Sequence, residues 1–102
     1  MRRGEVWWAL LTPKTRPVVL VSRDSHIDKR DILQAAPVSS RTRGLESQVP
    51  LGPEDGLPKE CMADAGSLIT VRKSHLIRRI TALSPSKRDA LDAALRFSLG
   101  LD

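Results

Sequence analysis

The side chains best suited to chemistry in this sequence are cations that recur in three short groups. Lys14 and Arg16 stand close together near the first predicted turn, and Arg41 and Arg43 follow the third predicted strand. The third group spans residues 72–79, inside a stretch of residues 65–88 without any acidic side chain. Such cations bind phosphate groups, in contacts that weaken as salt concentration rises. A solvated cationic face is the alternative interpretation, and composition alone does not separate the two.

The other chemistry-bearing residue types exclude several classes of enzyme. The 12 Asp and Glu residues are scattered, without an Asp-x-Asp pair or a His-carboxylate cluster at metal-ligand spacing, so two-metal phosphodiester cleavage has little support. No glycine-rich phosphate loop precedes a helix, and no Gly-x-Ser-x-Gly elbow is present. The single cysteine, Cys61, can form neither an internal disulfide nor a Cys-based zinc site, and we interpret it as a small buried residue. We expect chemistry without metal or cofactor, in a reducing cytoplasm.

Length and composition narrow the class of protein further. The chain has 102 residues, of which 40% are apolar and 28% charged, which predicts one compact domain over residues 1–102. The net charge of +5 favours a polyanionic partner. With an aromatic content of 3%, a protein that stacks several bases on a platform of rings is disfavoured. No apolar run approaches the roughly 20 residues of a membrane span, and no signal-peptide core follows residues 1–4.

The hydrophobic pattern predicts short strands joined by close turns. Alternation predicts a strand over residues 4–11. Its two tryptophans lie on opposite faces, and we favour Trp8 in the core and Trp7 in a dimer contact over stacking of Trp7 on a base. Residues 12–15 form a tight connection, and residues 17–21 and 32–38 predict two further strands separated by an exposed charged loop at residues 23–31. Residues 46–51 predict a fourth strand, and residues 52–56 a turn. Residues 61–65 and 67–71 are either two short strands or one strand bent at Gly66, and we favour the bent strand. A helical turn at residues 72–76 and a strand at residues 79–83 follow.

The end of the chain predicts an amphipathic helix. Ser84 is a suitable N-cap, Pro85 fits the first helical position, and Gly100 stands where a helix ends. One face carries the residues Leu91, Ala94, Leu95, Ser98 and Leu99. Together with the strands, this helix predicts a mainly β fold with α, a small and strongly curved barrel capped by the C-terminal helix.

Six short motifs occur in a fixed order along the chain: RGEVW at residues 3–7, RPVVLVS at 16–22, APVSS at 36–40, VPL at 49–51, AD at 63–64 and LSP at 83–85. This series resembles the MazF/PemK (Kid) family of toxin endoribonucleases from bacterial toxin–antitoxin pairs, and the resemblance covers essentially the whole chain. It implies an SH3-like barrel of the MazF/CcdB type, usually a homodimer. It also implies metal-independent cleavage of single-stranded RNA at short sequences, leaving a 2′,3′-cyclic phosphate and a 5′-hydroxyl.

The resemblance implies roles for three side chains. Arg16 matches the family's catalytic arginine before proline, and its guanidinium suits bidentate contact with phosphate oxygens. Ser39 falls at the catalytic Thr/Ser position, with Ser40 as the register alternative. Asp64 lies where some members use a catalytic aspartate, which can accept the 2′-hydroxyl proton. The alternative interpretations are that Arg16 pairs with an acid such as Glu5, and that Ser39 and Asp64 only shape turns.

The remaining implications concern binding. Lys14, Ser40, Arg41 and Arg43 are candidate RNA-binding residues, with solvated loop charges as the alternative for the arginines. The sequence departs from the family in two places, because Asp64 lacks a following Gln and the connection at residues 12–15 is short, which predicts an open groove. A cognate MazE-like antitoxin is the expected partner, with an acidic flexible segment that covers the groove.

Two other functions remain open from the sequence. A CcdB-like toxin would bind gyrase without nuclease activity, but the chain lacks the tryptophan-containing end on which that action depends. A plain RNA-binding barrel would bind RNA in a salt-dependent manner without cutting it.

Overall fold

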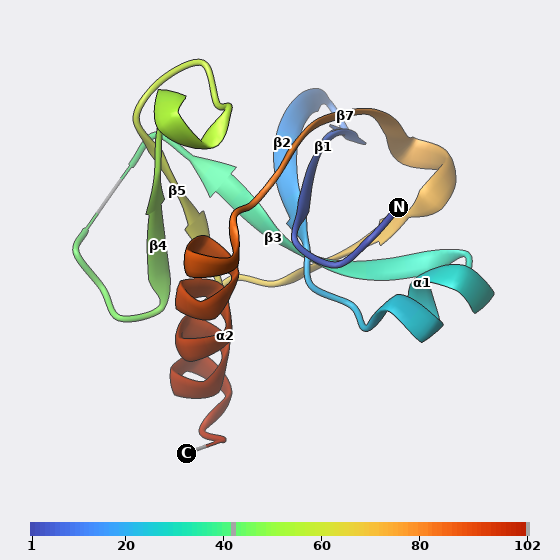
Figure 1. Ribbon diagram of the computed structural model, residues 1–102. Helices are drawn as coiled ribbons and strands as arrows, with labels where there is room; N and C mark the ends of the chain where they lie inside the picture. The colour runs from blue at the N-terminus through green and yellow to red at the C-terminus, as the bar shows by residue number, and fades with distance from the viewer. Residues whose placement is uncertain (42, 102) are drawn as a thin grey trace.

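A strongly bent antiparallel sheet of seven strands forms the frame of the protein (Figure 1). The structure is a computed structural model and describes residues 1–41 and 43–101. Its elements are β1 (Glu5–Leu11), β2 (Lys14–Leu20), α1 (Asp24–Lys29), β3 (Ile32–Ser39), β4 (Gln48–Leu51), η1 (Pro53–Asp55), β5 (Cys61–Asp64), β6 (Ile69–Arg72), η2 (Lys73–His75), β7 (Leu76–Ala82) and α2 (Pro85–Leu99).

The strand order is β4-β5-β3-β2-β1-β7, and β6 also pairs with β3. The two outermost strands of this order, β4 and β7, do not pair with each other in the described part of the chain, so the sheet curls without closing. The predicted mainly β architecture with a C-terminal helix is confirmed, and the barrel is an open one.

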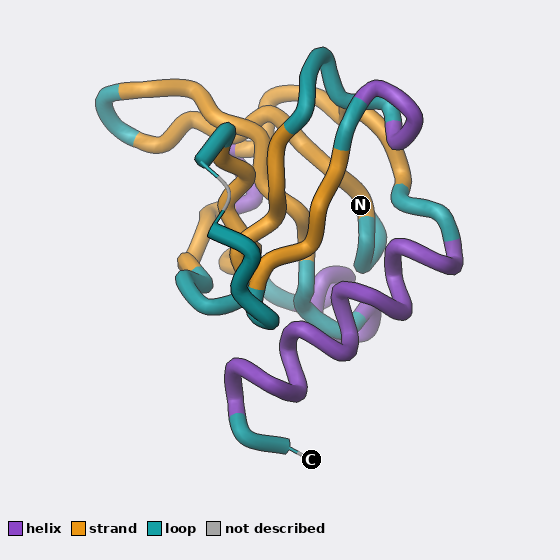
Figure 2. Tube along the Cα trace, turned by 90° about the vertical axis from the view of Figure 1, so that its left-hand side faces the viewer, coloured by secondary structure: helices purple, strands orange, loops and turns teal. Residues whose placement is uncertain are grey.

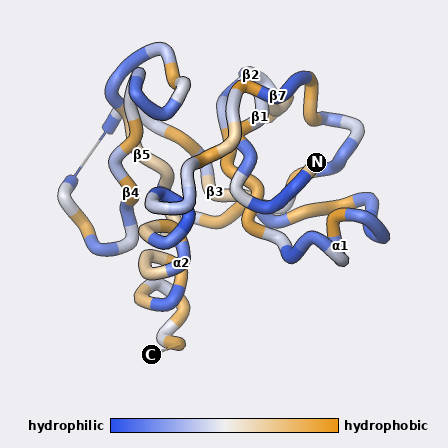
Figure 3. The backbone as a smooth tube through the Cα atoms, viewed as in Figure 1, coloured by the Kyte–Doolittle hydropathy of each residue, from blue (hydrophilic) through white to orange (hydrophobic). Residues whose placement is uncertain are grey.

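The bent sheet buries two separate apolar clusters, because side chains on successive residues of a strand point to opposite faces. Val19 and Ala36 belong to the cluster that α2 covers, whereas their neighbours Val18 and Ala35 belong to the second cluster. All four are completely buried. In Figure 3 the strands carry most of the apolar colour, and α1 is largely hydrophilic. Strands β2 and β3 are therefore apolar on both faces over their central residues.

Helix α2 has the predicted ends. The Ser84 hydroxyl accepts a hydrogen bond from Lys87 N, Pro85 occupies the first turn, and Gly100 ends the helix with φ +68°. The predicted apolar face is buried only in part: Leu91 is completely buried, but Leu99 is 55% exposed. The last turns of α2 extend past the strands (Figure 2), so they have no sheet to pack against.

Three details of the chain differ from the sequence prediction. The charged segment at residues 23–31 is a short helix, α1, anchored by the buried side chain of Ile27, rather than an exposed loop. Residues 61–71 form two strands, β5 and β6, rather than one bent strand; both pair with β3, and residues 65–68 separate them. The connection between β1 and β2 is only Thr12-Pro13, since β2 already begins at Lys14.

Trp7, and not Trp8, packs against a buried cluster. Trp7 packs against the second apolar cluster, and its Nε1 donates a hydrogen bond to Glu5. Trp8 is partly buried and lies outside both clusters, opposite Pro17 of β2. The prediction that Trp8 forms part of the core is therefore wrong. Both faces of β1 carry apolar residues, so the alternation did not identify the inner face.

Candidate active site

The pairing of β2, β3 and β5 places three predicted site residues on one face of the sheet. β2 pairs with β3 through Val18 and Pro37, and two residues further along each strand stand Arg16 and Ser39, which project to the same side. On the other edge of β3, the register with β5 continues to Asp64 beside Pro37, again on that side. Side chains that are far apart in the sequence therefore meet over one surface.

These three residues line a cleft of about 440 Å³, here called the basic cleft. The described residues in its lining are Arg16, Pro37, Ser39, Arg41, Arg43, Leu45, Ser47, Gln48, Met62, Asp64, Gly66 and Ser67. Three arginines and one carboxylate give the cleft a cationic character, which suits an anionic ligand. Of these four charged groups, the carboxylate is the one that can accept a proton.

The Arg16 guanidinium is exposed in the cleft and is not neutralised by a neighbour. Within residues 1–41 and 43–101 no carboxylate lies within ion-pair distance of it. The alternative interpretation, in which Arg16 pairs with Glu5, is wrong. Glu5 Oε2 lies instead 3.5 Å from a guanidinium nitrogen of Arg79. The donors of Arg16 are therefore available to a ligand.

Ser39 combines a structural contact with a free donor. Its Oγ accepts a hydrogen bond of 3.1 Å from Arg41 N, so the side chain does shape the turn after β3. A hydroxyl has one hydrogen to donate in addition to its acceptor capacity. The bond from Arg41 therefore orients the oxygen and leaves the hydroxyl hydrogen for a ligand in the cleft.

Asp64 also holds a turn. Its Oδ1 accepts a bond of 2.9 Å from Gly66 N, and its Oδ2 accepts one of 3.2 Å from Ser67 Oγ. The carboxylate thus fills the capping role that was its alternative interpretation, and it lines the basic cleft as well. Each carboxylate oxygen retains a further acceptor position, so the group can still receive a proton.

The predicted RNA-binding residues divide into two sets. Arg41 and Arg43 line the basic cleft, and the loop that carries them is held by a 2.8 Å bond from Arg43 N to Gln48 Oε1. Lys14 and Ser40 are not part of the lining of this cleft. Lys14 stands two residues before Arg16 on β2, on the same side and nearer the hairpin turn, while Ser40 lines a second cavity.

That second cavity, here called the apolar pocket, has a volume of about 230 Å³. It is lined by Trp8, Arg16, Pro17, Val38, Ser39, Ser40, Leu57, Pro58, Lys59 and Cys61. Burial of the Cys61 thiol, together with the nearby charges of Asp55 and Glu60, raises its pKa, so it is protonated at neutral pH and is not a nucleophile. The sequence analysis did not find this pocket, because it assigned Trp8 to the core.

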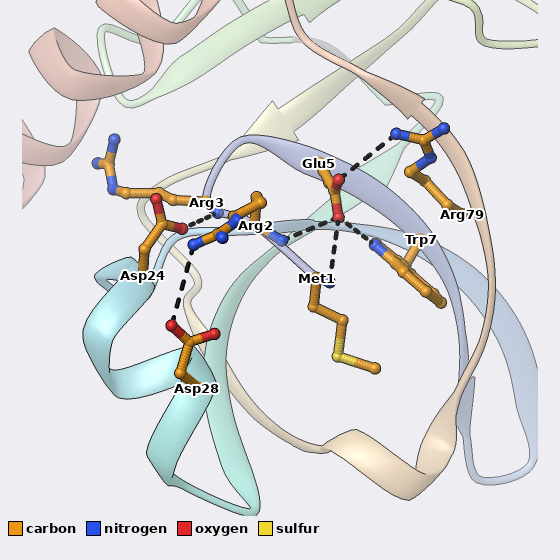
Figure 4. Close-up of polar contacts among 8 residues, drawn as sticks. All are labelled: Met1, Arg2, Arg3, Glu5, Trp7, Asp24, Asp28 and Arg79. Carbon is orange, nitrogen blue, oxygen red and sulfur yellow. Dashed lines mark hydrogen bonds and ion pairs between the residues drawn. The ribbon is translucent and has the colours of Figure 1, made fainter.

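A cluster of polar contacts around the Glu5 carboxylate holds the start of β1 (Figure 4). Glu5 Oε1 accepts hydrogen bonds from Arg2 N at 2.9 Å and from Trp7 Nε1 at 3.0 Å, and Met1 N lies 3.9 Å away. Partial burial acts to raise the pKa of Glu5, but these hydrogen bonds and the charges of the N-terminus and Arg79 outweigh burial and lower it. Glu5 is therefore ionised and fixes the start of the strand.

A larger cavity of about 850 Å³ lies on another part of the surface, between α1 and the C-terminal half of α2. Its lining includes Arg3 paired with Asp92 at 2.7 Å, and Asp24, which accepts a bond from Arg3 N. Two aspartates offset most of the charge of its three arginines, so this cavity is less suited to a polyanion than the basic cleft.

The described residues contain neither a cluster suited to a metal ion nor a helix suited to a membrane. Across residues 1–41 and 43–101, no group of three or more His, Cys, Asp or Glu side chains is arranged to hold a metal ion. No helix in the same part of the chain has the length and apolar character needed to cross a membrane.

Comparison with known proteins identifies the family. Residues 2–99 match the model of the PemK-like, MazF-like toxins of type II toxin–antitoxin systems. The chain therefore belongs to the PemK-like, MazF-like toxin family. This is the family that the sequence motifs indicated, and not the CcdB-like group of the alternative hypothesis.

Individual relatives agree with this assignment. The chain is 33% identical over 101 residues to the probable endoribonuclease MazF2 of Mycobacterium tuberculosis, covering 98% of this chain and 99% of the relative. It is also 33% identical over 99 residues to the probable endoribonuclease MazF5 of the same organism, covering 95% of this chain and 91% of the relative.

Solved structures show the same fold. The Mycobacterium tuberculosis toxin MazF-mt6 superimposes with a TM-score of 0.88 at 28% identity, covering 96% of this chain and 98% of that one. A mycobacterial endoribonuclease solved in complex with its cognate antitoxin superimposes with a TM-score of 0.91 at 24% identity, covering 100% and 97%. The second likeness supports the open-barrel fold alone.

Proposed function

We propose that this protein is the endoribonuclease toxin of a type II toxin–antitoxin pair and cuts single-stranded RNA at short sequences without a metal ion. Residues 1–102 act as one domain, in the cytoplasm, as a homodimer. Family membership and the names of the curated relatives support this function. The observation that carries it is that Arg16 and Ser39 line the basic cleft together, while no carboxylate of residues 1–41 and 43–101 lies within ion-pair distance of Arg16.

The proposed reaction uses the substrate's own nucleophile. The 2′-oxygen attacks the adjacent phosphorus, the bond from phosphorus to the 5′-oxygen breaks, and the products are a 2′,3′-cyclic phosphate and a 5′-hydroxyl. Arg16 binds the non-bridging oxygens, where negative charge increases in the transition state, and Ser39 donates its hydroxyl hydrogen to the same phosphate. Asp64 accepts the proton of the 2′-hydroxyl, and the leaving 5′-oxygen takes a proton from water.

The other cations extend the path of the RNA away from the reacting phosphate. Arg41 and Arg43, in the lining of the basic cleft, bind neighbouring phosphates or base edges. Lys14 contacts the RNA on the side of Arg16 nearer the hairpin turn, and Ser40 contacts the RNA from the apolar pocket. Each phosphate contact adds affinity that falls as salt rises. For single strands, each contact contributes about 0.7 to the slope of the logarithm of the binding constant against the logarithm of the salt concentration, here called the salt slope.

The proposed partner is a MazE-like antitoxin whose acidic, flexible segment folds across the basic cleft and covers Arg16. The charge of the cleft supports this mode, since three arginines attract an acidic peptide as they attract RNA. RNA and the antitoxin segment should therefore compete for the protein, and simultaneous binding of both at the cleft would contradict the proposed mode of inhibition.

Cleavage of a long defined RNA in EDTA tests the function. We expect discrete cuts with 5′-hydroxyl ends, and an Arg16→Ala variant should cut about 100- to 1,000-fold more slowly, the usual loss for one group that stabilises transition-state charge. Arg16→Lys keeps the charge but not the planar fork, and should recover only part of the rate. Full activity of Arg16→Ala would remove the proposed site.

A pair of variants at Ser39 separates its two roles. Ser39→Thr keeps both the acceptor for Arg41 N and the hydroxyl hydrogen, whereas Ser39→Ala removes both. We expect near-normal cleavage by the threonine variant and a loss in the alanine variant that exceeds any change in its thermal stability. Equal rates for the two variants would show that the hydroxyl takes no part in the reaction.

A further inference from the structure

The basic cleft and the apolar pocket have two lining residues in common, Arg16 and Ser39. The arrangement of the strands explains why. β2 and β3 are paired only from Val18 to Leu20 of β2, so the two strands separate beyond Val18 and Pro37. Arg16 and Ser39 flank this separation, with the basic cleft on one side and the apolar pocket on the other.

We propose that the apolar pocket is a nucleobase subsite, in which one of the two bases that flank the scissile phosphate stacks on the indole of Trp8. The inference rests on the proposed function and deepens it. A phosphate held between Arg16 and Ser39 has a nucleoside on each side, and the two cavities are the spaces on the two sides of that position.

The walls of the pocket suit a base. Trp8 and Pro17 stand opposite each other on β1 and β2 and project to the same side of the sheet, so they form an apolar wall together. Trp8 is only partly buried, which leaves part of the ring open to the pocket. The volume of about 230 Å³ lies below the roughly 300–1,000 Å³ of sites for drug-sized molecules and fits a single planar ring system.

The polar groups of the lining suit the rest of a nucleotide. Among the described residues, those with charged side chains in the lining are Arg16 and Lys59, and none of them carries a carboxylate. Lys59 is exposed, so its ammonium group can reach the phosphate beyond the stacked base. The Ser40 hydroxyl is a donor and an acceptor for the edge of the base, which gives the pocket a means to discriminate between bases.

The first experiment uses synthetic RNAs in which the cleavage site is already mapped and one flanking base at a time is replaced by an abasic sugar. In the unmodified protein, loss of the base that enters the pocket should lower kcat/KM about 5- to 150-fold, the range for removal of one base–aromatic stack. In Trp8→Leu, replacement of that base by an abasic sugar should lower kcat/KM little further. Trp7→Phe, on the opposite face of β1, is the matched control and should keep the full sensitivity.

The second experiment leaves Trp8 in place. In Trp7→Phe, Trp8 is the remaining tryptophan, so its fluorescence can be followed alone. A non-cleavable RNA with a 2′-deoxy sugar at the cleavage site should protect Trp8 from fluorescence quenching by acrylamide. The abasic version of the same RNA should not. Lys59→Gln should in addition lower the salt slope of RNA binding by about 0.7.

The outcomes separate this inference from the proposed function. If the unmodified protein makes no 5′-hydroxyl cuts, the proposed function is wrong. A second outcome is that the unmodified protein cuts, that the abasic substrate lowers kcat/KM by the same factor in Trp8→Leu and in Trp7→Phe, and that acrylamide still reaches Trp8 in the complex. In that case the nucleobase subsite is wrong while the proposed function stands.

Discussion

Replacement of Glu5 by Gln tests the N-terminal cluster and changes little besides charge. The side chain keeps its length, and its remaining carbonyl oxygen can still accept from Arg2 N and Trp7 Nε1. Glu5 is 13% exposed, so its ionised form depends on these two donors and on Arg79 rather than on water. Hydrogen bonds to charged groups contribute about 1.5–3 kcal/mol and neutral ones about 0.5–1.5 kcal/mol.

With two such bonds affected, we expect Glu5→Gln to lower the free energy of unfolding at pH 7 by about 2–3 kcal/mol. For a domain of this size each kcal/mol corresponds to about 4–8 °C in Tm. The pKa of Glu5 in the folded protein lies below its ordinary value of 4.5. Its contribution is therefore present in full above that value, and is lost as the pH falls through the folded-state pKa.

Urea unfolding of both proteins between pH 7 and pH 3, followed by far-UV circular dichroism, measures this difference. The two curves should converge in acid. Glu46→Gln is the control, because Glu46 is exposed in the loop before β4 and its replacement should have little effect. A difference between wild type and Glu5→Gln that stays constant down to pH 3, or increases, would refute the account of the cluster.

Three further predictions concern the site and the core. Asp64→Asn should slow RNA cleavage about 100- to 10,000-fold in single-turnover assays while Tm stays close to wild type, since an amide oxygen can still accept from Gly66 N; an equal rate would exclude Asp64 as the proton acceptor. Leu91→Ala, at a completely buried position of α2, should cost about 2–5 kcal/mol in urea unfolding, and a smaller loss would mean that the helix is loosely packed. Arg41→Gln should lower the salt slope of RNA binding by about 0.7, whereas an unchanged slope would leave Arg41 without a phosphate contact.

Local patterns predicted the elements whose signals are complete within a few residues. Alternation gave β1 and β4, and a cap at each end gave α2. α1 was missed because six residues with a single buried side chain, Ile27, show no helical period. The inner face of β1 was misassigned because apolar side chains occur on both faces, and only the tertiary packing of Trp7 decides between them.

The candidate site followed from the family resemblance rather than from periodicity. The motifs gave Arg16, Ser39 and Asp64, and strand registers that no local pattern contains bring these residues to one cleft. Lys14 was included with Arg16 because of its nearness in the sequence, although it lies outside the cleft lining. The apolar pocket needs four segments of the chain to be placed together, so sequence alone did not reveal it.

In the proposed mechanism, the short pairing between β2 and β3 separates the residues that set the rate of cleavage from the residues that select the RNA. Completely buried residues, Val18 to Leu20, hold the two strands together, so the interior of the molecule sets the spacing between Arg16 and Ser39. The residues at positions 41, 43 and 59 are instead carried by exposed loops. Substitutions in those loops can therefore give related proteins new cutting sequences while the interior preserves the distance on which bond breaking depends.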